Sequence, residues 1–209
     1  MVLDVEQISK DFFAAEFVIK RDNAEVGRAF LKGHLGSIEA KIKGNYYGRV
    51  FYMDFSKAAG FKSKKCFRPY FITDDYCKDG VIYQAERKLG LFKGYSYREM
   101  RYCNDIYEMY SLGLGKEGYK SPIYLGDRQI AQIDMDCVVK NQLFKYKIYA
   151  IDNSFARIAV LFCLYFYVSG VYSPGEKVIS SETKYYTVTK NKVLLEKYDK
   201  EFVKTILHN

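Results

Sequence analysis

The densest run of basic residues in the chain lies between Lys57 and Arg68. The segment KAAGFKSKKCFR carries no acidic residue and five basic ones, namely Lys57, Lys62, Lys64, Lys65 and Arg68. It opens a longer stretch, residues 57–101, with eleven Lys or Arg and five Asp or Glu, in a chain of net charge +8. Because a local positive field attracts anionic surfaces, we expect these five side chains to bind an anion or a lipid headgroup. The alternative is a solvated loop without a ligand.

Two other motifs match ligand-binding loops but lack their usual flanks. GLGKEG, residues 113–118, has the glycine spacing of a dinucleotide site, but the strand-like YKSPIYL follows where a helix should hold the phosphates. DYCKDGVIYQAE places Asp75, Asp79, Gly80 and Glu86 at calcium-loop positions, but Cys77 takes the third position and the flanks alternate like strands. We expect turns at both places, and therefore no nucleotide, metal or other cofactor.

The residues that could support catalysis are few and scattered. The two histidines are His34, in a turn-like segment, and His208, next to the C-terminus. Asp134 and Asp136 share one face of an expected strand, which is a common arrangement on solvated sheets. No CxxC pair occurs among the five cysteines, which are Cys66, Cys77, Cys103, Cys137 and Cys163. We therefore expect reduced thiols, and neither a zinc site nor a disulfide framework. These observations predict a protein that is not an enzyme.

The pattern of the first 150 residues is that of β-strands. With 21 Tyr, 15 Phe and three Pro, the composition favours strands with buried and half-exposed aromatic positions. Apolar and polar residues alternate with period two in SIEAKIK, QIAQIDMDCVVK and FKYKIYAI. Short turns rich in Gly, Asn and Asp separate such runs. Asp79-Gly80 indicates a type I′ hairpin turn. We therefore expect a mainly β fold in a single domain, residues 1–209.

Two segments after residue 150 depart from this pattern. The apolar run in residues 154–169 follows the capping residues Asp152, Asn153 and Ser154 and ends at Gly170, which predicts a helix buried on every side. Its 14 residues from Phe155 to Val168 are fewer than the roughly 20 that span a bilayer. Its one charged residue, Arg157, is expected to reach water or a carboxylate. Residues 191–207 have the three- and four-residue spacing of a single amphipathic helix, capped by Asn191.

This order of elements resembles the tubby C-terminal-like superfamily, which includes tubby proteins, phospholipid scramblases and LURP-one-related proteins. Three segments carry the resemblance. They are the hairpin ITDDYCKDGVIYQAERK, the strand KSPIYLGDRQIAQID, and YKIYAIDNSFARIAVLFCLYFYV, in which a strand leads into the hydrophobic helix. It implies a closed antiparallel barrel of roughly twelve strands around that helix. Residues 171–209 would then be a C-terminal extension. Tubby proteins bind phosphoinositide headgroups through basic side chains, and no pair of basic residues in this chain aligns with theirs.

Charge and resemblance together suggest a non-enzymatic protein that binds an anionic phospholipid headgroup or membrane surface. The N-terminal MVLDVEQISKDFF lacks the pattern of a signal peptide, so we expect a cytoplasmic protein that associates peripherally with a membrane. Two alternatives remain open. The chain could be a scaffold with a protein partner, or a nucleic-acid binder in which basic and aromatic residues interleave.

Overall fold

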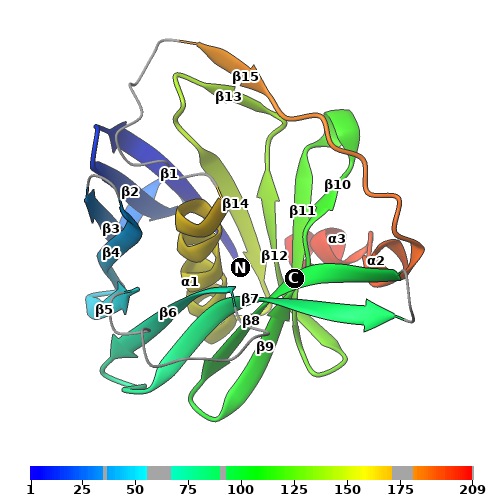
Figure 1. The fold of residues 1–209 in the computed structure, drawn as a ribbon, viewed down its shortest axis with the longest axis horizontal. Helices are drawn as coiled ribbons and strands as arrows, with labels where there is room; N and C mark the ends of the chain where they lie inside the picture. The colour runs from blue at the N-terminus through cyan, green and yellow to red at the C-terminus, as the bar shows by residue number, and fades with distance from the viewer. Residues whose placement is uncertain (35–36, 56–66, 90–92, 171–180, 209) are drawn as a thin grey trace.

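The computed structural model describes the chain except residues 35–36, 56–66, 90–92, 171–180 and 209 (Figure 1). The barrel is built mainly from long strands of the first 150 residues. The strands are β1 (Val2–Lys10), β2 (Ala14–Arg21), β3 (Ala24–His34), β4 (Ser37–Tyr46), β5 (Arg49–Asp54), β6 (Phe67–Asp74), β7 (Gly80–Leu89), β8 (Lys93–Tyr102), β9 (Asp105–Met109), β10 (Leu112–Gly113), β11 (Tyr119–Leu125), β12 (Arg128–Met135), β13 (Val138–Lys140), β14 (Lys145–Ala150) and β15 (Glu182–Lys184). The helices are α1 (Asn153–Gly170), α2 (Lys192–Glu196) and α3 (Phe202–His208).

The main sheet closes on itself as an antiparallel barrel. Its order is β10-β11-β12-β14-β1-β2-β3-β4-β5-β6-β7-β8-β9, and a further pairing of β9 with β11 joins the two ends. In that pairing Met109 faces Ile123 and Tyr107 faces Leu125. The ring therefore contains twelve strands, with β10 outside it. The fold expected from the sequence is confirmed.

Alternation along the strands separates the interior of the barrel from its surface. In β14, Tyr146, Ile148 and Ala150 are buried while Lys145 and Lys147 are exposed, as the period-two pattern predicts. The expected strand through Val139 is interrupted after Met135. Beyond that point β13 leaves the barrel and pairs with β15 of the C-terminal segment. This long-range partner, which local alternation does not reveal, explains the break.

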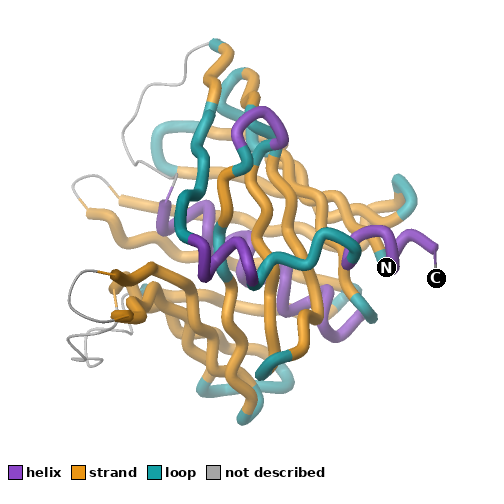
Figure 2. The backbone as a smooth tube through the Cα atoms, turned by 90° about the vertical axis from the view of Figure 1, so that its right-hand side faces the viewer, coloured by secondary structure: helices purple, strands orange, loops and turns teal. Residues whose placement is uncertain are grey.

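Helix α1 runs inside the ring of strands (Figure 1), and in the perpendicular view of Figure 2 strands lie on both sides of it. Its side chains are buried from Ala156 to Tyr165 and again from Tyr167 to Ser169. Asp152 caps it, because its Oδ1 accepts hydrogen bonds from the amides of Ser154 (2.9 Å) and Phe155 (3.0 Å). The helix is long and apolar enough to cross a membrane, but 72% of it is buried within the protein. The prediction of a buried central helix is confirmed.

The C-terminal segment is helical, but it forms two short helices outside the barrel where the sequence predicts one helix over residues 191–207. Asn191 caps α2 as expected, with its Oδ1 3.4 Å from the amide of Leu194. Asp199 then accepts a hydrogen bond from the amide of Glu201, and the Tyr124 hydroxyl donates to the carbonyl of Lys197. Both contacts use backbone groups that a continuous helix needs, so the helix is divided between α2 and α3.

The hairpin of β6 and β7 is confirmed, but its turn differs from the predicted type I′ turn. Residues 75–79 form a five-residue connection, and Gly80 is already the first residue of β7. Asp74, the last residue of β6, closes the turn by accepting hydrogen bonds from the amides of Tyr76 and Cys77, both at 2.8 Å. An aspartate that bonds amides two and three residues further on is an alternative to a tight glycine turn.

Candidate functional site

A cleft lies at the end of the barrel where α1 begins. Its volume is about 680 Å³. Its lining consists of two arginines, five tyrosines, Cys103 and the first turn of α1. Among the residues that the structure describes, no acidic side chain lines the cleft. The lining includes Tyr46, Tyr47, Arg49, Tyr76, Tyr102, Cys103, Tyr107, Asn153 and Arg157.

Beneath the cleft lies a buried carboxylate, Asp74. Its side chain is fully buried, and its Oδ2 accepts hydrogen bonds from Arg157 Nη2 at 2.7 Å and from the Tyr102 hydroxyl. Burial raises the pKa of Tyr102, and the bond to Asp74 raises it further. Tyr102 is therefore a protonated donor at neutral pH. Asp74 accordingly joins β6, β8 and α1 at the floor of the cleft.

Arg157 is committed to this floor. Its side chain is 9% exposed, and its guanidinium lies 5.3 Å from the centre of the Tyr76 ring. Within the described part of the chain, its buried Nε has no hydrogen-bond partner. Because the charge of Arg157 is balanced by Asp74, this arginine adds little net charge to the cleft.

Arg49 supplies the unbalanced charge of the cleft. It is exposed, and its guanidinium lies 4.3 Å from the centre of the Tyr76 ring, within the range of a cation–π interaction. Among the described residues it forms no ion pair and donates no hydrogen bond. The tight turn of Tyr47 and Gly48, both at positive φ (49° and 75°), places Arg49 at the start of β5. Arg49 is therefore a positioned cation whose donors have no partner in the described part of the chain.

The remaining walls combine aromatic surface with hydroxyl groups. The Tyr46 hydroxyl donates to Asn153 Oδ1 at 2.7 Å, and the Tyr107 hydroxyl donates to Asp105 Oδ2 at 3.2 Å. Burial raises the pKa of both tyrosines, so both stay neutral at physiological pH. Asp152 already occupies the amides of Ser154 and Phe155. Arg49, and not the helix terminus, is therefore the group that can attract an anion.

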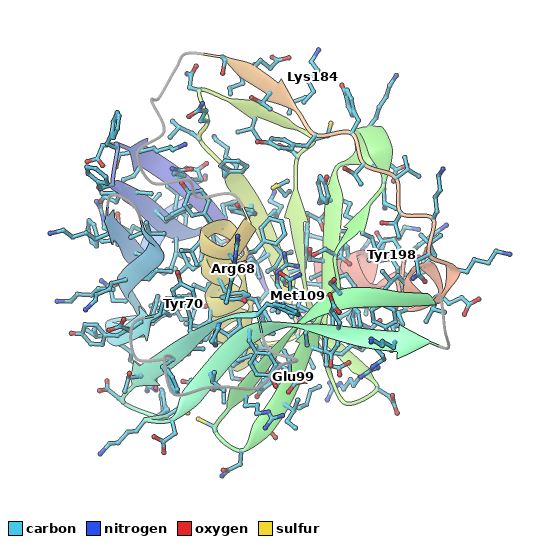
Figure 3. The ribbon with its side chains drawn as sticks, viewed as in Figure 1. Arg68, Tyr70, Glu99, Met109, Lys184 and Tyr198 are labelled. Carbon is cyan, nitrogen blue, oxygen red and sulfur yellow. The ribbon has the colours of Figure 1, made fainter. Side chains whose placement is uncertain are left out.

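The structure describes one of the five site residues predicted from the sequence. Lys57, Lys62, Lys64 and Lys65 fall outside the described residues. Arg68 is described, and it lies beside α1 (Figure 3). Its Nη1 donates to the carbonyl of Ser169 in the last turn of that helix, the end opposite the cleft. A cation near the free carbonyls of a helix C-terminus is favourable, so this contact stabilises the end of α1, and the role of Arg68 in binding a lipid headgroup stays a prediction.

The other motifs have structural explanations in the described residues. In residues 113–118, Gly113 is the last residue of β10 and Gly115–Glu117 form a single 3-10 turn. Asp134 pairs with Lys120 on the neighbouring strand.

Sequence reasoning identified neither Asp74 nor Arg49 as a site residue. The aromatic turn NYYG, residues 45–48, was a signal for a turn but not for the cleft that it borders.

No protein-family model matches this sequence, and neither the curated proteins nor the solved structures contain a match. The geometry of the barrel and its cleft is therefore the basis for a functional proposal.

Proposed function

We propose that this is a non-enzymatic binding protein that holds an anionic amphiphile in the cleft at the N-terminal end of α1. The observation that carries the proposal is Arg49, an exposed guanidinium stacked on Tyr76 with no acidic partner among the described residues. An arginine held by an aromatic ring loses little conformational freedom when it binds a carboxylate or phosphate, and it can bind either group through two hydrogen bonds.

The walls of the cleft suit a ligand with an apolar or planar part next to its charge. Tyr47 and Tyr76 present exposed ring surface, and the buried Tyr46, Tyr102 and Tyr107 complete the lining. The cleft volume of about 680 Å³ is in the usual range for small-molecule sites. The hydroxyls of Tyr46 and Tyr102 are already bonded to Asn153 and Asp74. Recognition would thus depend on one charged contact and on aromatic packing. A phospholipid headgroup with the adjacent part of its chains fits this description.

We also propose that the chain belongs to the tubby C-terminal-like superfamily. Support comes from the closed ring of antiparallel strands and from β14, which leads through Asp152 directly into the enclosed helix. The 39 residues after Gly170 are a departure from tubby proteins, in which the helix lies at the C-terminus. Binding of a membrane surface through Lys57, Lys62, Lys64, Lys65 and Arg68 is a separate prediction, and Arg68, the one of these that the structure describes, lies near the C-terminal end of α1.

Isothermal titration calorimetry with short-chain soluble lipids tests the proposed function. Dihexanoyl phosphatidic acid, kept below its micelle-forming concentration, should bind, and dihexanoyl phosphatidylcholine should bind much more weakly. Arg49→Gln removes the free cation and should weaken binding of the acid at least tenfold, as expected for a charge-assisted contact. Arg128→Gln, an exposed position at the same end but outside the cleft, is the matched control and should leave binding unchanged. Equal affinity for both lipids, or full binding by Arg49→Gln, would overturn the proposal.

A further inference from the structure

Two cysteines occupy adjacent turns at the rim of the cleft. Cys77 lies in the connection between β6 and β7, and Cys103 lies in the turn between β8 and β9. Each directly follows a tyrosine that lines the cleft, Tyr76 and Tyr102 respectively. Cys77 is buried and Cys103 is exposed, and both are free thiols.

Cys103 contacts both Cys77 and the residue before it. The amide of Cys103 donates to Cys77 Sγ at 3.3 Å, and Cys103 Sγ lies 3.6 Å from the carbonyl oxygen of Tyr76, the residue before Cys77. Burial raises the pKa of the Cys103 thiol to about 11, with a further contribution from the neighbouring Cys77 thiol. Cys163 is buried within the barrel, and Cys137 Sγ contacts the carbonyl of Lys116. Neither of these cysteines has such a contact with another described thiol.

We infer that Cys77 and Cys103 form a disulfide in the presence of a low-molecular-weight disulfide such as oxidised glutathione, and that this bond regulates the cleft. The regulatory part rests on the proposed function, whereas the formation of the bond does not. A covalent link between the two turns would restrict Tyr76, on which Arg49 stacks. A more rigid rim loses less freedom on binding, so the oxidised protein should bind its ligand more tightly.

The reaction balances as two thiol–disulfide exchanges. The exposed Cys103 loses its proton, and its thiolate attacks one sulfur of oxidised glutathione, which releases a glutathione thiolate and leaves a mixed disulfide. The thiolate of Cys77 then attacks the Cys103 sulfur and releases the second glutathione. Two protein thiols are oxidised, and one glutathione disulfide is reduced to two glutathione molecules. Because the thiol predominates at neutral pH, the reaction should be slow at pH 7 and faster at pH 9.

The test uses the full chain treated with oxidised glutathione or with dithiothreitol. Peptide mass mapping after alkylation should show a Cys77–Cys103 cross-link in the oxidised sample. The midpoint of thermal unfolding should rise by several degrees, because the bond closes a loop in the unfolded chain. Cys103→Ser should abolish both effects, while Cys137→Ser, the matched control, should retain them. Glutathione attached to Cys103 without the cross-link would overturn the inference, because it would show that Cys77 cannot reach the mixed disulfide.

Calorimetry with dihexanoyl phosphatidic acid then separates the two proposals. The oxidised protein should bind several-fold more tightly than the reduced protein. If the cross-link forms and its formation leaves the affinity unchanged, the regulatory role is wrong. If neither form binds the lipid although the cross-link forms, the proposed function fails and the cysteine pair stands. If the reduced protein binds and no cross-link forms, the present inference alone fails.

Discussion

Arg157 Nη2 lies 2.7 Å from Asp74 Oδ2, and this ion pair links the first turn of the central helix to the end of a barrel strand 83 residues earlier. Side chains of α1 are otherwise almost entirely apolar, and apolar contacts permit many rotations of a helix about its axis. A buried charged contact is directional, so this pair holds α1 in one rotation within the barrel. The same carboxylate orders the turn that carries Tyr76, which makes the pair a support for the cleft as well.

Replacing Arg157 with Met should destabilise the protein strongly. The substitution keeps most of the side-chain volume but leaves the buried carboxylate of Asp74 without its cation, and breaking a buried pair from one side costs about 3–5 kcal/mol. Urea denaturation followed by circular dichroism measures this loss. Lys204→Met, which removes an exposed pair with Glu201, is the control and should change stability little. A loss below about 1 kcal/mol for Arg157→Met would show that Asp74 is not held as the structure indicates.

Replacing Tyr146 with Phe should stabilise the protein. The Tyr146 hydroxyl is buried inside the barrel and has no hydrogen-bond partner in the described part of the chain. Removing an unsatisfied buried polar group relieves a desolvation cost of about 1 kcal/mol or more. Tyr165→Phe is the matched control, because the Tyr165 hydroxyl donates to the carbonyl of Arg68 at 2.9 Å and its loss should destabilise. Urea denaturation should therefore shift the two variants in opposite directions.

Stability should fall steeply in alkaline solution. Burial raises the pKa of Tyr46, Tyr107, Tyr146 and Tyr165 above the ordinary value near 10. The folded protein therefore keeps protons that the unfolded chain releases. This contribution to stability is fully present below about pH 10 and is lost as the pH rises above it. Thermal unfolding at a series of alkaline pH values, with tyrosinate absorbance as a second signal, should show ionisation together with unfolding. Ionisation of these tyrosines in the folded protein would contradict their burial.

Substitutions in α1 should affect folding and not membrane location. Leu161 is completely buried, and Leu161→Ala should cost about 2–5 kcal/mol through lost contacts and a cavity. Leu164→Asp places a charge at a position that is 2% exposed and should unfold and aggregate the protein. Leu207→Ala, at a position that is 60% exposed in α3, should be neutral. Urea denaturation of the soluble fraction measures the first effect. A wild-type chain that required detergent to stay in solution would contradict the buried helix.

The basic stretch provides an independent prediction about membranes. The protein should sediment with vesicles that contain phosphatidylserine and not with pure phosphatidylcholine vesicles, and added salt should weaken the binding. Reversing the charges of Lys62, Lys64 and Lys65 to Glu should abolish sedimentation. The matched control reverses three exposed lysines of the C-terminal segment, Lys190, Lys192 and Lys200. Equal binding to both vesicle types, or equal loss in both triple variants, would show that the basic stretch is a solvated loop.

Local periodicity in the sequence was sufficient for most of the fold. Alternation with period two predicted the barrel strands, and a capped run of apolar residues predicted α1 nearly to its ends. Both patterns are local because each follows from which side of one strand or helix is buried. Local patterns failed to predict the structure where a segment distant in the sequence bonds to the backbone of the segment in question. The pairing of β13 with β15 and the division of the C-terminal helix beside Tyr124 are of this kind.

The candidate site shows the same division between local and distant information. From the sequence alone it followed that strands would surround a buried helix, and that the single arginine of this helix would require water or a carboxylate. The folded chain was needed to identify the carboxylate as Asp74 and to show that Arg49 stacks on Tyr76 at the same end of the barrel. The density of charge along a chain can be counted from its sequence, but the partners of each charge cannot. The neutralisation of one arginine and the freedom of another depend on which side chains the closed barrel brings within hydrogen-bonding distance.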